Sequence, residues 1–359
     1  RNLGYGGAGP ANSGDVVLDL KRMNKILEID EARAFVLVEP GVSYFDLYNY
    51  IQEKKLKLWV DVPDPGWGSL IGNALDKGSG YTLPNLRNHF EAHCGMEVVL
   101  ANGELMRTGL GALPNAETWQ QHKNGYGPIV DGLFAQSNFG IVTKMGFWLM
   151  PEPDAVLTCE AQFPRYDDLI PFVDTLNYLE NSQVFNGMPD IGSPLLGSPQ
   201  IAQWIHLLEN GWTPPKPEHG KLIAGTEVGY SKELEEYGIK NKIPYWTCRF
   251  VFYGGEKANL ANWEFAQEKF LAVIPEATFS IESSLKTPLT EKQKKEVNGP
   301  DFGIPSLRNF AFGARSKYSP APPANGHAWY SPVIPRTGKD LLEANRVLIP
   351  AAKKAGLPL

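Results

Sequence analysis

The sequence predicts an α+β protein built from two units that meet near Pro153. Up to that proline, short strand-like runs lie between glycine turns, and few helices are expected. Beyond it, longer strands and helices alternate, which is typical of a sheet layer covered by helices. With 359 residues, 43% of them hydrophobic, the chain is long enough to bury a sizeable core.

Composition and charge exclude several classes of partner. Thirty-four basic and 40 acidic side chains give a net charge of −6, and no Lys/Arg run stands out, so nucleic acid and anionic membranes are not expected as partners. The chain lacks an apolar stretch of roughly 18 residues and a signal peptide, which predicts a soluble protein of the cytoplasm or another intracellular compartment. Cys94, Cys159 and Cys248 lie far apart in apolar or strand-like runs and are expected to be buried free thiols.

In the first unit, apolar runs predict strands at residues 16–20 and 34–38. A helix is expected to follow the second strand, because Ser43 can cap it and Asp46 lies three residues further on.

Two later segments of this unit also read as strands. Asn102 and Gly103 stand between two apolar runs of segment 96–108, which predicts a hairpin closed by a type I′ turn. Segment 139–150 reads as a buried strand that Pro151 closes.

In the second unit, strand-like and helical patterns follow one another in pairs. We expect strands at 157–163, 246–253 and 328–335, and helices at 169–179, 257–274 and 339–354. Segment 187–229 is rich in Gly and Pro and is interpreted as an excursion over the surface.

The chain opens on a glycine-rich loop that matches the letters of a dinucleotide fingerprint, G-x-G-x-x-G, at Gly4–Gly9. That fingerprint works only where it begins a helix, but here Pro10 and then a strand-like run follow. A Rossmann turn is therefore disfavoured. Two interpretations remain: a nest of backbone N–H groups that approaches a diphosphate closely, and a tight surface loop without a ligand.

The wider pattern resembles one family of flavoproteins. Motifs in matching order and spacing occur at residues 1–7 (RNLGYGG), 38–41 (VEPG), 62–69 (VPDPGWGS), 72–73 (GN), 80–82 (GYT), 95–104 (GMEVVLANGE) and 136–144 (QSNFGIVTK). They are similar to the group of vanillyl-alcohol oxidase, eugenol oxidase and p-cresol methylhydroxylase. The similarity is almost continuous up to Pro153 and much weaker beyond it.

The resemblance implies that the protein binds FAD and that each unit is a partial domain. Residues 1–152 would be the second subdomain of an FAD-binding domain of the PCMH type. Residues 153–359 would be an α+β cap domain with an antiparallel sheet and flanking helices. The first FAD subdomain would precede Arg1. The histidine or tyrosine that carries covalent FAD in relatives would follow Leu359, as would a Tyr-Arg pair, so we expect a fragment truncated at both ends.

The resemblance also assigns catalytic and substrate-binding side chains. Tyr5 matches a tyrosine that binds the phenolic oxygen of the substrate, where phenolate character helps hydride leave the benzylic carbon. Asp64 matches an oxidase aspartate near the reacting carbon, which can act as a base for water. Tyr81 matches a tyrosine on the substrate side. The alternatives are a packed loop tyrosine for Tyr5, turn chemistry in a Pro-Asp-Pro-Gly segment for Asp64, and core packing for Tyr81.

The cofactor-binding positions follow from the same motifs. They are small residues and backbone groups expected to lie along FAD: Arg1, Asn2, Gly4, Tyr5, Gly6, Gly7, Pro63, Asp64, Gly66, Gly68, Ser69, Gly72, Asn73, Gly140, Ile141 and Val142. Helix capping would equally explain Ser69, and a plain buried strand would explain the last three.

No metal site is expected. His89, His93 and Glu97 are spaced four apart, but residues 96–100 read as a strand, where this spacing does not bring ligands together.

The expected function is oxidation of para-substituted phenols through a quinone methide, with oxygen as acceptor. The resemblance leaves a cytochrome open as the acceptor, and a truncated flavin-binding protein without catalysis is a third alternative. A homo-oligomer is expected for the full-length protein.

Overall fold

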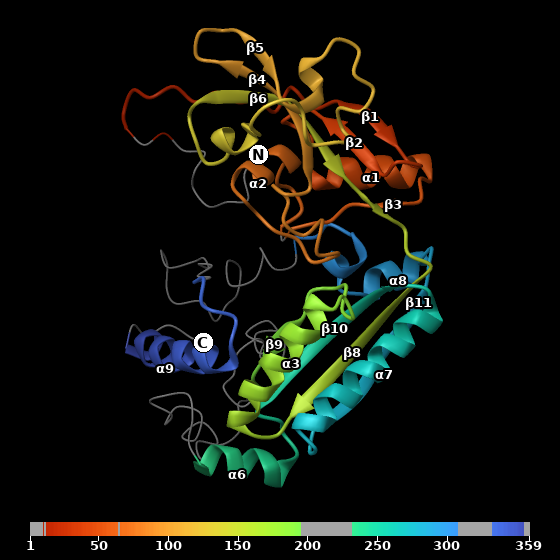
Figure 1. The fold of residues 1–359 in the computed structure, drawn as a ribbon, viewed down its shortest axis with the longest axis vertical. Coiled ribbons are helices and arrows are strands. Elements are labelled where there is room, and N and C mark those ends of the chain that lie inside the picture. Colours follow the sequence, from red (N-terminus) through yellow and green to blue (C-terminus); the bar gives the residue numbers. More distant parts are fainter. Residues whose placement is uncertain (1–9, 11, 64, 195–231, 308–331, 355–359) are drawn as a thin grey trace. The chain divides into compact units, whose positions relative to one another are not determined.

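The computed structural model describes residues 10, 12–63, 65–194, 232–307 and 332–354. The chain forms two compact units (Figure 1). The first comprises Arg1–Glu152 and Pro288–Phe310, and the second comprises Pro153–Thr287 and Ala311–Leu359. The predicted division into 1–152 and 153–359 therefore needs a correction, because Pro288–Phe310 returns to the first unit. In that segment Ser306 O accepts a hydrogen bond of 2.8 Å from Gly66 N, a long-range contact without a local sequence signal.

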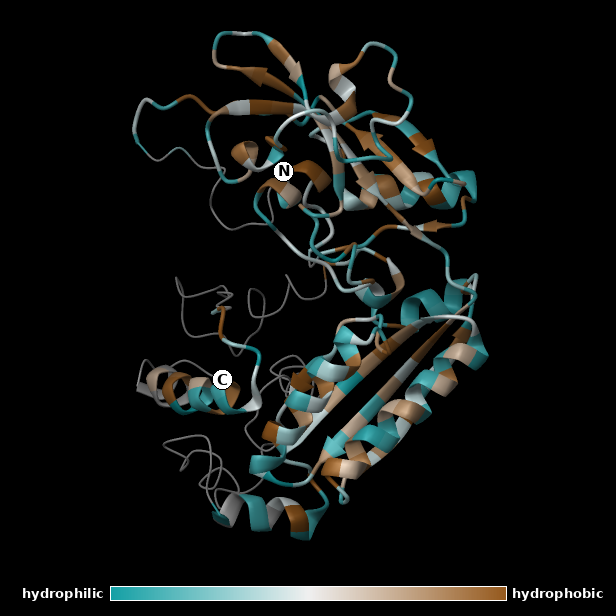
Figure 2. Ribbon diagram, in the orientation of Figure 1, coloured by the Kyte–Doolittle hydropathy of each residue, from teal (hydrophilic) through white to brown (hydrophobic). Residues whose placement is uncertain are grey.

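A five-stranded antiparallel sheet forms the first unit. Its order is β1 (Ile26–Asp30), β2 (Phe35–Val38), β6 (Gly140–Trp148), β4 (His93–Leu100) and β5 (Leu105–Arg107). A small second sheet pairs β3 (Leu58–Trp59) with β7 (Met150–Pro151). The helices are α1 (Tyr44–Lys54), α2 (Leu70–Leu75) and α8 (Glu291–Glu296), with 3₁₀ turns at Gly109–Ala112, Asp131–Phe134 and Gly299–Phe302. In Figure 2, α8 is hydrophilic and α2 largely hydrophobic.

The core of this unit lies between α1, α2 and the central strands. Val36 and Val38 of β2, together with Met145 of β6, pack in one cluster with Leu47 and Ile51 of α1. All five side chains are at most 1% exposed. Burial on this scale, about 1.5–3 kcal/mol for each large apolar side chain, fixes the helices on the sheet.

The start of α1 confirms the predicted capping box. Ser43 Oγ accepts a hydrogen bond from Asp46 N at 3.2 Å, and an Asp46 carboxylate oxygen accepts one from Ser43 N at 2.9 Å. The helix ends at Lys55, whose φ of 55° breaks the helical path.

Two predictions for this unit are wrong. Residues 16–20 form no strand, and Val16 is 94% exposed. The strand lies instead at β1, where pairing with β2 supplies the partner that an isolated apolar run lacks. The β4–β5 hairpin exists, but its turn is not type I′, because Gly103 has a positive φ of 83° and Asn102 does not. Gly103 N donates to Leu100 O, as in a type I turn followed by a left-handed residue.

Glu97 on β4 gives a prediction for pH dependence. Its buried carboxylate accepts hydrogen bonds from Lys144 at 3.0 Å and Arg107 at 2.9 Å. Burial raises the pKa of Glu97, but these cations outweigh it and leave the pKa below its ordinary value of 4.5. The lowered pKa stabilises the folded state above pH 4.5, and this contribution disappears as the pH falls through the folded pKa.

We therefore expect Glu97→Gln to lower the free energy of unfolding at neutral pH. The difference from the unsubstituted protein should shrink below about pH 4. Urea unfolding of both proteins across this pH range checks the expectation. A difference that is independent of pH would contradict the ion-pair account.

The second unit contains a four-stranded antiparallel sheet. Its order is β11 (Thr278–Lys286), β8 (Ala155–Phe163), β10 (Trp246–Gly254) and β9 (Asp190–Gly192). The helices in the described part of this unit are α3 (Leu169–Asn181), α6 (Lys232–Asn241), α7 (Glu256–Val273) and α9 (Gly338–Lys354), with a 3₁₀ turn at Tyr166–Asp168. An antiparallel sheet with flanking helices agrees with the expected cap. The strand predicted at 328–335 is absent over its described part, 332–335.

Helices α3 and α7 cover one face of this sheet. Figure 2 shows hydrophobic and hydrophilic residues alternating along both helices. Alternate residues of β8 and β10, such as Cys159, Phe163 and Phe250, share one buried cluster with Phe172 of α3 and Phe270 of α7. An aromatic core therefore holds the layers together.

The thiols lie where the sequence predicts. Cys94, Cys159 and Cys248 are free and buried. Burial raises the pKa of Cys94 to about 11 and that of Cys159 to about 12. In the part of the chain that is described, no helix has the length and apolarity needed to cross a bilayer.

Candidate functional site

The loop that follows β3 runs along the start of α1. Tyr44 N donates to Gly68 O at 3.2 Å, and Phe45 N donates to Gly66 O at 3.3 Å. Leu70 N in turn donates to Val42 O at 3.2 Å. The first N–H groups of a helix have no partner within the helix, so these bonds both satisfy α1 and fix the loop.

Ser69 ends this loop and begins α2. Its hydroxyl accepts a hydrogen bond of 3.0 Å from Gly72 N, and its side chain is buried. Helix capping, one of the two roles expected for Ser69, is therefore present. The contact also sets the direction in which α2 leaves the loop.

Asp61, in the loop that follows β3, is the centre of a buried polar network. One carboxylate oxygen, Oδ1, accepts hydrogen bonds from the backbone N–H groups of Thr82 at 2.7 Å and Tyr81 at 3.2 Å. The Thr82 hydroxyl donates to the same oxygen. The second oxygen, Oδ2, lies 2.8 Å from His89 Nε2. Asp61 and His89 are 7% and 4% exposed, so neither group is solvated enough to do without these partners.

The other ring nitrogen of His89 faces two helices. Nδ1 lies 2.6 Å from Asn73 Nδ2 of α2 and 3.0 Å from the hydroxyl of Tyr44 of α1. Asn73 Nδ2 also donates to the Tyr44 hydroxyl at 2.9 Å. A carboxylate only accepts, so His89 carries a proton on Nε2, and in the neutral ring Nδ1 accepts from Asn73. Burial raises the pKa of Tyr44 well above its ordinary value, so its hydroxyl stays protonated.

Two glycines allow the turn at 78–82 to approach this network. A Cβ on Gly78 would lie 1.6 Å from Asn73 Oδ1, and one on Gly80 would lie 1.9 Å from Asp61 Oδ2. Both positions therefore need glycine for close packing rather than for an unusual φ.

Several predicted site residues can be located. The loop (Pro63, Gly66, Gly68, Ser69), α2 (Gly72, Asn73) and the turn with Tyr81 are held together by the contacts above. Tyr81 is partly buried. Asn73 directs its amide nitrogen to Tyr44 and His89. Their predicted contacts with FAD and substrate remain predictions.

The positions predicted on β6, residues 140–142, are part of the regular strand. Val142 is 4% exposed and belongs to the core, whereas Ile141 is 40% exposed. A Cβ on Gly140 would lie 2.4 Å from Val98 Cγ1. Helix α2 packs against strand β6. The three predicted positions on β6 therefore lie in the same unit as the loop.

Seven predicted positions lie outside the described residues: Arg1, Asn2, Gly4, Tyr5, Gly6, Gly7 and Asp64.

Four residues of the network were not predicted as site residues: Tyr44, Asp61, Thr82 and His89. Asp61 and Asp64 lie in the same short segment, residues 61–65, and the family motif pointed only to Asp64. His89 is only one of six histidines, and its partner lies 28 residues away in sequence. The available signal was the position of Asp61 at the end of a short buried strand.

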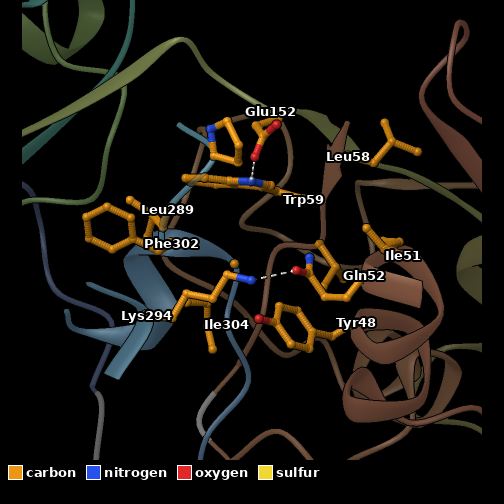
Figure 3. A pocket seen from close by; sticks show the side chains of 13 residues that line it. Tyr48, Ile51, Gln52, Leu58, Trp59, Glu152, Leu289, Lys294, Phe302 and Ile304 are labelled. Atoms are coloured by element: carbon orange, nitrogen blue, oxygen red, sulfur yellow. Dashed lines mark hydrogen bonds between the residues drawn. The ribbon is translucent and has the colours of Figure 1, made fainter. Parts of the chain in front are cut away.

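A cavity elsewhere in this unit lies between α1 and the returning segment. Figure 3 shows Lys294 directed at Gln52, and Trp59 at Glu152, with hydrogen bonds of 2.9 and 3.3 Å. The cavity has a volume of about 50 Å³ and includes none of the predicted site residues. Small-molecule sites usually measure about 300–1,000 Å³, so this cavity is interpreted as a packing gap.

The residues considered for a metal site have separate partners. His89 pairs with Asp61, His93 Nε2 with Asp131 at 3.0 Å, and Glu97 with Lys144 and Arg107. Within the described ranges, no group of three or more His, Cys, Asp or Glu side chains is arranged to hold a metal ion.

Comparison with known proteins finds a group of flavoproteins to which the chain is similar. Residues 1–109 match a family model described as an FAD binding domain. The chain is 34% identical over 356 residues to the 4-cresol dehydrogenase [hydroxylating] flavoprotein subunit of Pseudomonas putida, a match that covers 97% of the chain and 63% of that protein.

Two solved structures are also similar. The 4-ethylphenol oxidase of Gulosibacter chungangensis, in complex with isoeugenol, aligns with a TM-score of 0.71 at 32% identity, covering 96% of this chain and 62% of that one. Substrate-bound p-cresol methylhydroxylase aligns with a TM-score of 0.65 at 33% identity, covering 83% and 54%. The chain thus spans less than two thirds of each of these relatives. In sequence and in its PCMH-type fold, the chain is similar to the FAD-linked flavoproteins of the vanillyl-alcohol oxidase family.

Proposed function

We propose that this chain belongs to an enzyme that uses FAD to oxidise para-substituted phenols, namely 4-hydroxybenzylic alcohols and 4-alkyl- or 4-allylphenols. The observation that carries the proposal is the 34% identity, along 97% of the chain, to a 4-cresol dehydrogenase flavoprotein subunit. The likeness to 4-ethylphenol oxidase, at 32% identity, supports the same substrate class. The proposal concerns the whole flavoprotein, since the chain spans 63% and 62% of these relatives.

In this proposal the described residues would form one wall of the FAD site. The loop 62–69, the start of α2 and the turn 78–82 are the segments that the family resemblance assigns to the flavin. Backbone bonds to α1 and the Asp61 network join these segments into one rigid patch. A rigid support is what a cofactor site requires, because the reacting atoms must be held in place to within about 0.5 Å.

The side chains of this chain would act on the phenol from two positions. Bound FAD would supply the hydride acceptor at flavin N5. Tyr5 would donate its hydroxyl proton in a hydrogen bond to the phenolic oxygen and favour the phenolate, which weakens the benzylic C–H bond. Asp64 would act as a base when water adds to the quinone methide that forms from the substrate. Both residues, at positions 5 and 64, lie outside the described ranges.

Oxygen is proposed as the final acceptor, because Asp64 matches an aspartate of the oxidases in the family. With vanillyl alcohol or eugenol in air, the FAD-loaded protein should then release hydrogen peroxide. A peroxidase-coupled assay measures this release. Absence of both peroxide and flavin reduction with these phenols would reject the proposed function.

A cytochrome is the second candidate acceptor. A relative named as a dehydrogenase and as a flavoprotein subunit favours it, because such a name implies another subunit. Rapid flavin reduction, slow reoxidation in air and fast turnover with added cytochrome c would select this acceptor over oxygen.

A further inference from the structure

We infer that Asp61 and His89 form a positioning dyad, in which the His89 ring orients the Asp61 carboxylate so that it fixes the backbone of Tyr81 and Thr82 at the substrate side of the flavin. The inference rests on the proposed function, since Tyr81 is assigned to the substrate side by that account. Neither Asp61 nor His89 is itself taken to touch FAD or substrate.

A single oxygen of the Asp61 carboxylate makes three hydrogen bonds to the turn at 78–82. Its Oδ1 accepts from Thr82 N at 2.7 Å and from Tyr81 N at 3.2 Å, and also from the Thr82 hydroxyl. Two consecutive backbone N–H groups and one hydroxyl on one oxygen leave the turn little freedom to rotate. Hydrogen bonds to a charged acceptor are about twice as strong as those between neutral groups.

The His89 ring sets the direction of that carboxylate. Its Nε2 lies 2.8 Å from Asp61 Oδ2, the oxygen that the turn does not use. Its Nδ1 is held by Asn73 and Tyr44 at 2.6 and 3.0 Å, so the ring cannot flip without losing partners at both ends. Because the His89 ring is held at both nitrogens, it fixes the orientation of the Asp61 carboxylate.

The dyad also connects the elements of the flavin wall. Tyr44 heads α1, which binds the loop at Gly68, and Asn73 belongs to α2. Gly80, beside the carboxylate, has no space for a side chain. A shift of Asp61 would therefore be transmitted to the turn that carries Tyr81, while α1 and the core beneath it stay in place.

A matched pair of variants separates positioning from packing. In His89→Gln the side-chain amide reaches the place of Nε2 and can still donate to Asp61. In His89→Asn the amide reaches only the place of Nδ1, so the contacts with Asn73 and Tyr44 can persist but the bond to Asp61 is lost. Both variants remove the ring, so lost packing should lower the melting temperature of the FAD-loaded protein in each.

The readouts are the visible absorption and circular dichroism spectrum of bound flavin, and the limiting rate of anaerobic flavin reduction by 4-ethylphenol. We expect His89→Asn to alter the spectrum and to lower the limiting rate about 10- to 100-fold, since small misplacements of a reacting group have effects of this size. His89→Gln should be at least about tenfold faster than His89→Asn. Identical spectra and identical limiting rates in the two variants would overturn the inference.

Two further arms keep the test decisive. If His89→Asn does not accumulate as folded protein, Thr82→Val replaces it, because this change removes one hydroxyl bond to Asp61 at nearly constant volume. A flavin spectrum and rate equal to those of the unsubstituted protein would then overturn the inference. If no 4-alkylphenol reduces the unsubstituted protein, the proposed function fails, and the comparison of flavin spectra still decides whether the dyad positions the turn.

Discussion

Replacing Phe270 with alanine is expected to destabilise the second unit by about 3–5 kcal/mol, the usual cost of removing a buried phenylalanine ring. Phe270 of α7 is 0% exposed. Its ring centroid lies 5.6 Å from that of Phe172 on α3 and 5.7 Å from that of Phe163 on β8. The ring therefore joins two helices to the sheet, and its loss leaves a cavity that three elements would have to fill. Urea unfolding followed by aromatic circular dichroism measures the effect.

Phe265 on the same helix provides the control. It is 36% exposed, and Lys269 Nζ lies 5.0 Å from the centroid of its ring in a cation–π contact. Phe265→Ala should therefore change the free energy of unfolding by no more than about 0.5–1 kcal/mol. Equal destabilisation by the two substitutions would show that the aromatic cluster does not hold this unit together.

Replacing Tyr5 with phenylalanine is expected to slow flavin reduction by phenols about 10²- to 10³-fold. This is the typical loss when one hydrogen-bond donor to a developing oxyanion is removed. The change removes the hydroxyl that would favour the phenolate and keeps the aromatic ring. Stopped-flow reduction of the FAD-loaded protein by vanillyl alcohol without oxygen measures the rate.

Tyr126→Phe is the matched control for Tyr5→Phe. Tyr126 is 93% exposed, and the proposed function gives it no role. Its rate should equal that of the unsubstituted protein. If Tyr5→Phe reduces its flavin as fast as Tyr126→Phe does, Tyr5 does not bind the phenolic oxygen.

Local signals predicted the elements whose causes are local. The Ser43–Asp46 capping box and the apolar spacing of Leu47 and Ile51 act within one helix, so α1 was predicted correctly. The β4–β5 hairpin was also visible, although the type of its turn depends on the φ of Asn102, which Gly103 alone does not determine.

Elements that depend on distant partners were missed. β11 is an edge strand whose residues are mostly exposed, so it lacks the apolar run of a buried strand, and its pairing with β8 defines it. Likewise, the return of Pro288–Phe310 to the first unit depends on contacts such as Gly66 N to Ser306 O, across 240 residues of sequence.

The candidate site also combines residues that the sequence motifs predicted with contacts that depend on distant partners. The motifs pointed to the loop 62–69, to Asn73 and to Tyr81, because family resemblance records positions along the chain. It did not indicate that Asn73 binds His89, or that Asp61 holds the turn. Those contacts join four segments, and only the folded chain brings them together.

The central claim, oxidation of phenols by FAD, is tested most directly by mixing the FAD-loaded protein with 4-ethylphenol in the absence of oxygen and recording the visible flavin absorbance. The methyl ether of the same phenol serves as the control, because it has the same alkyl group but cannot form a phenolate. We predict that 4-ethylphenol bleaches the flavin and that the ether does not. Bleaching by neither compound, or by both at the same rate, would contradict the account.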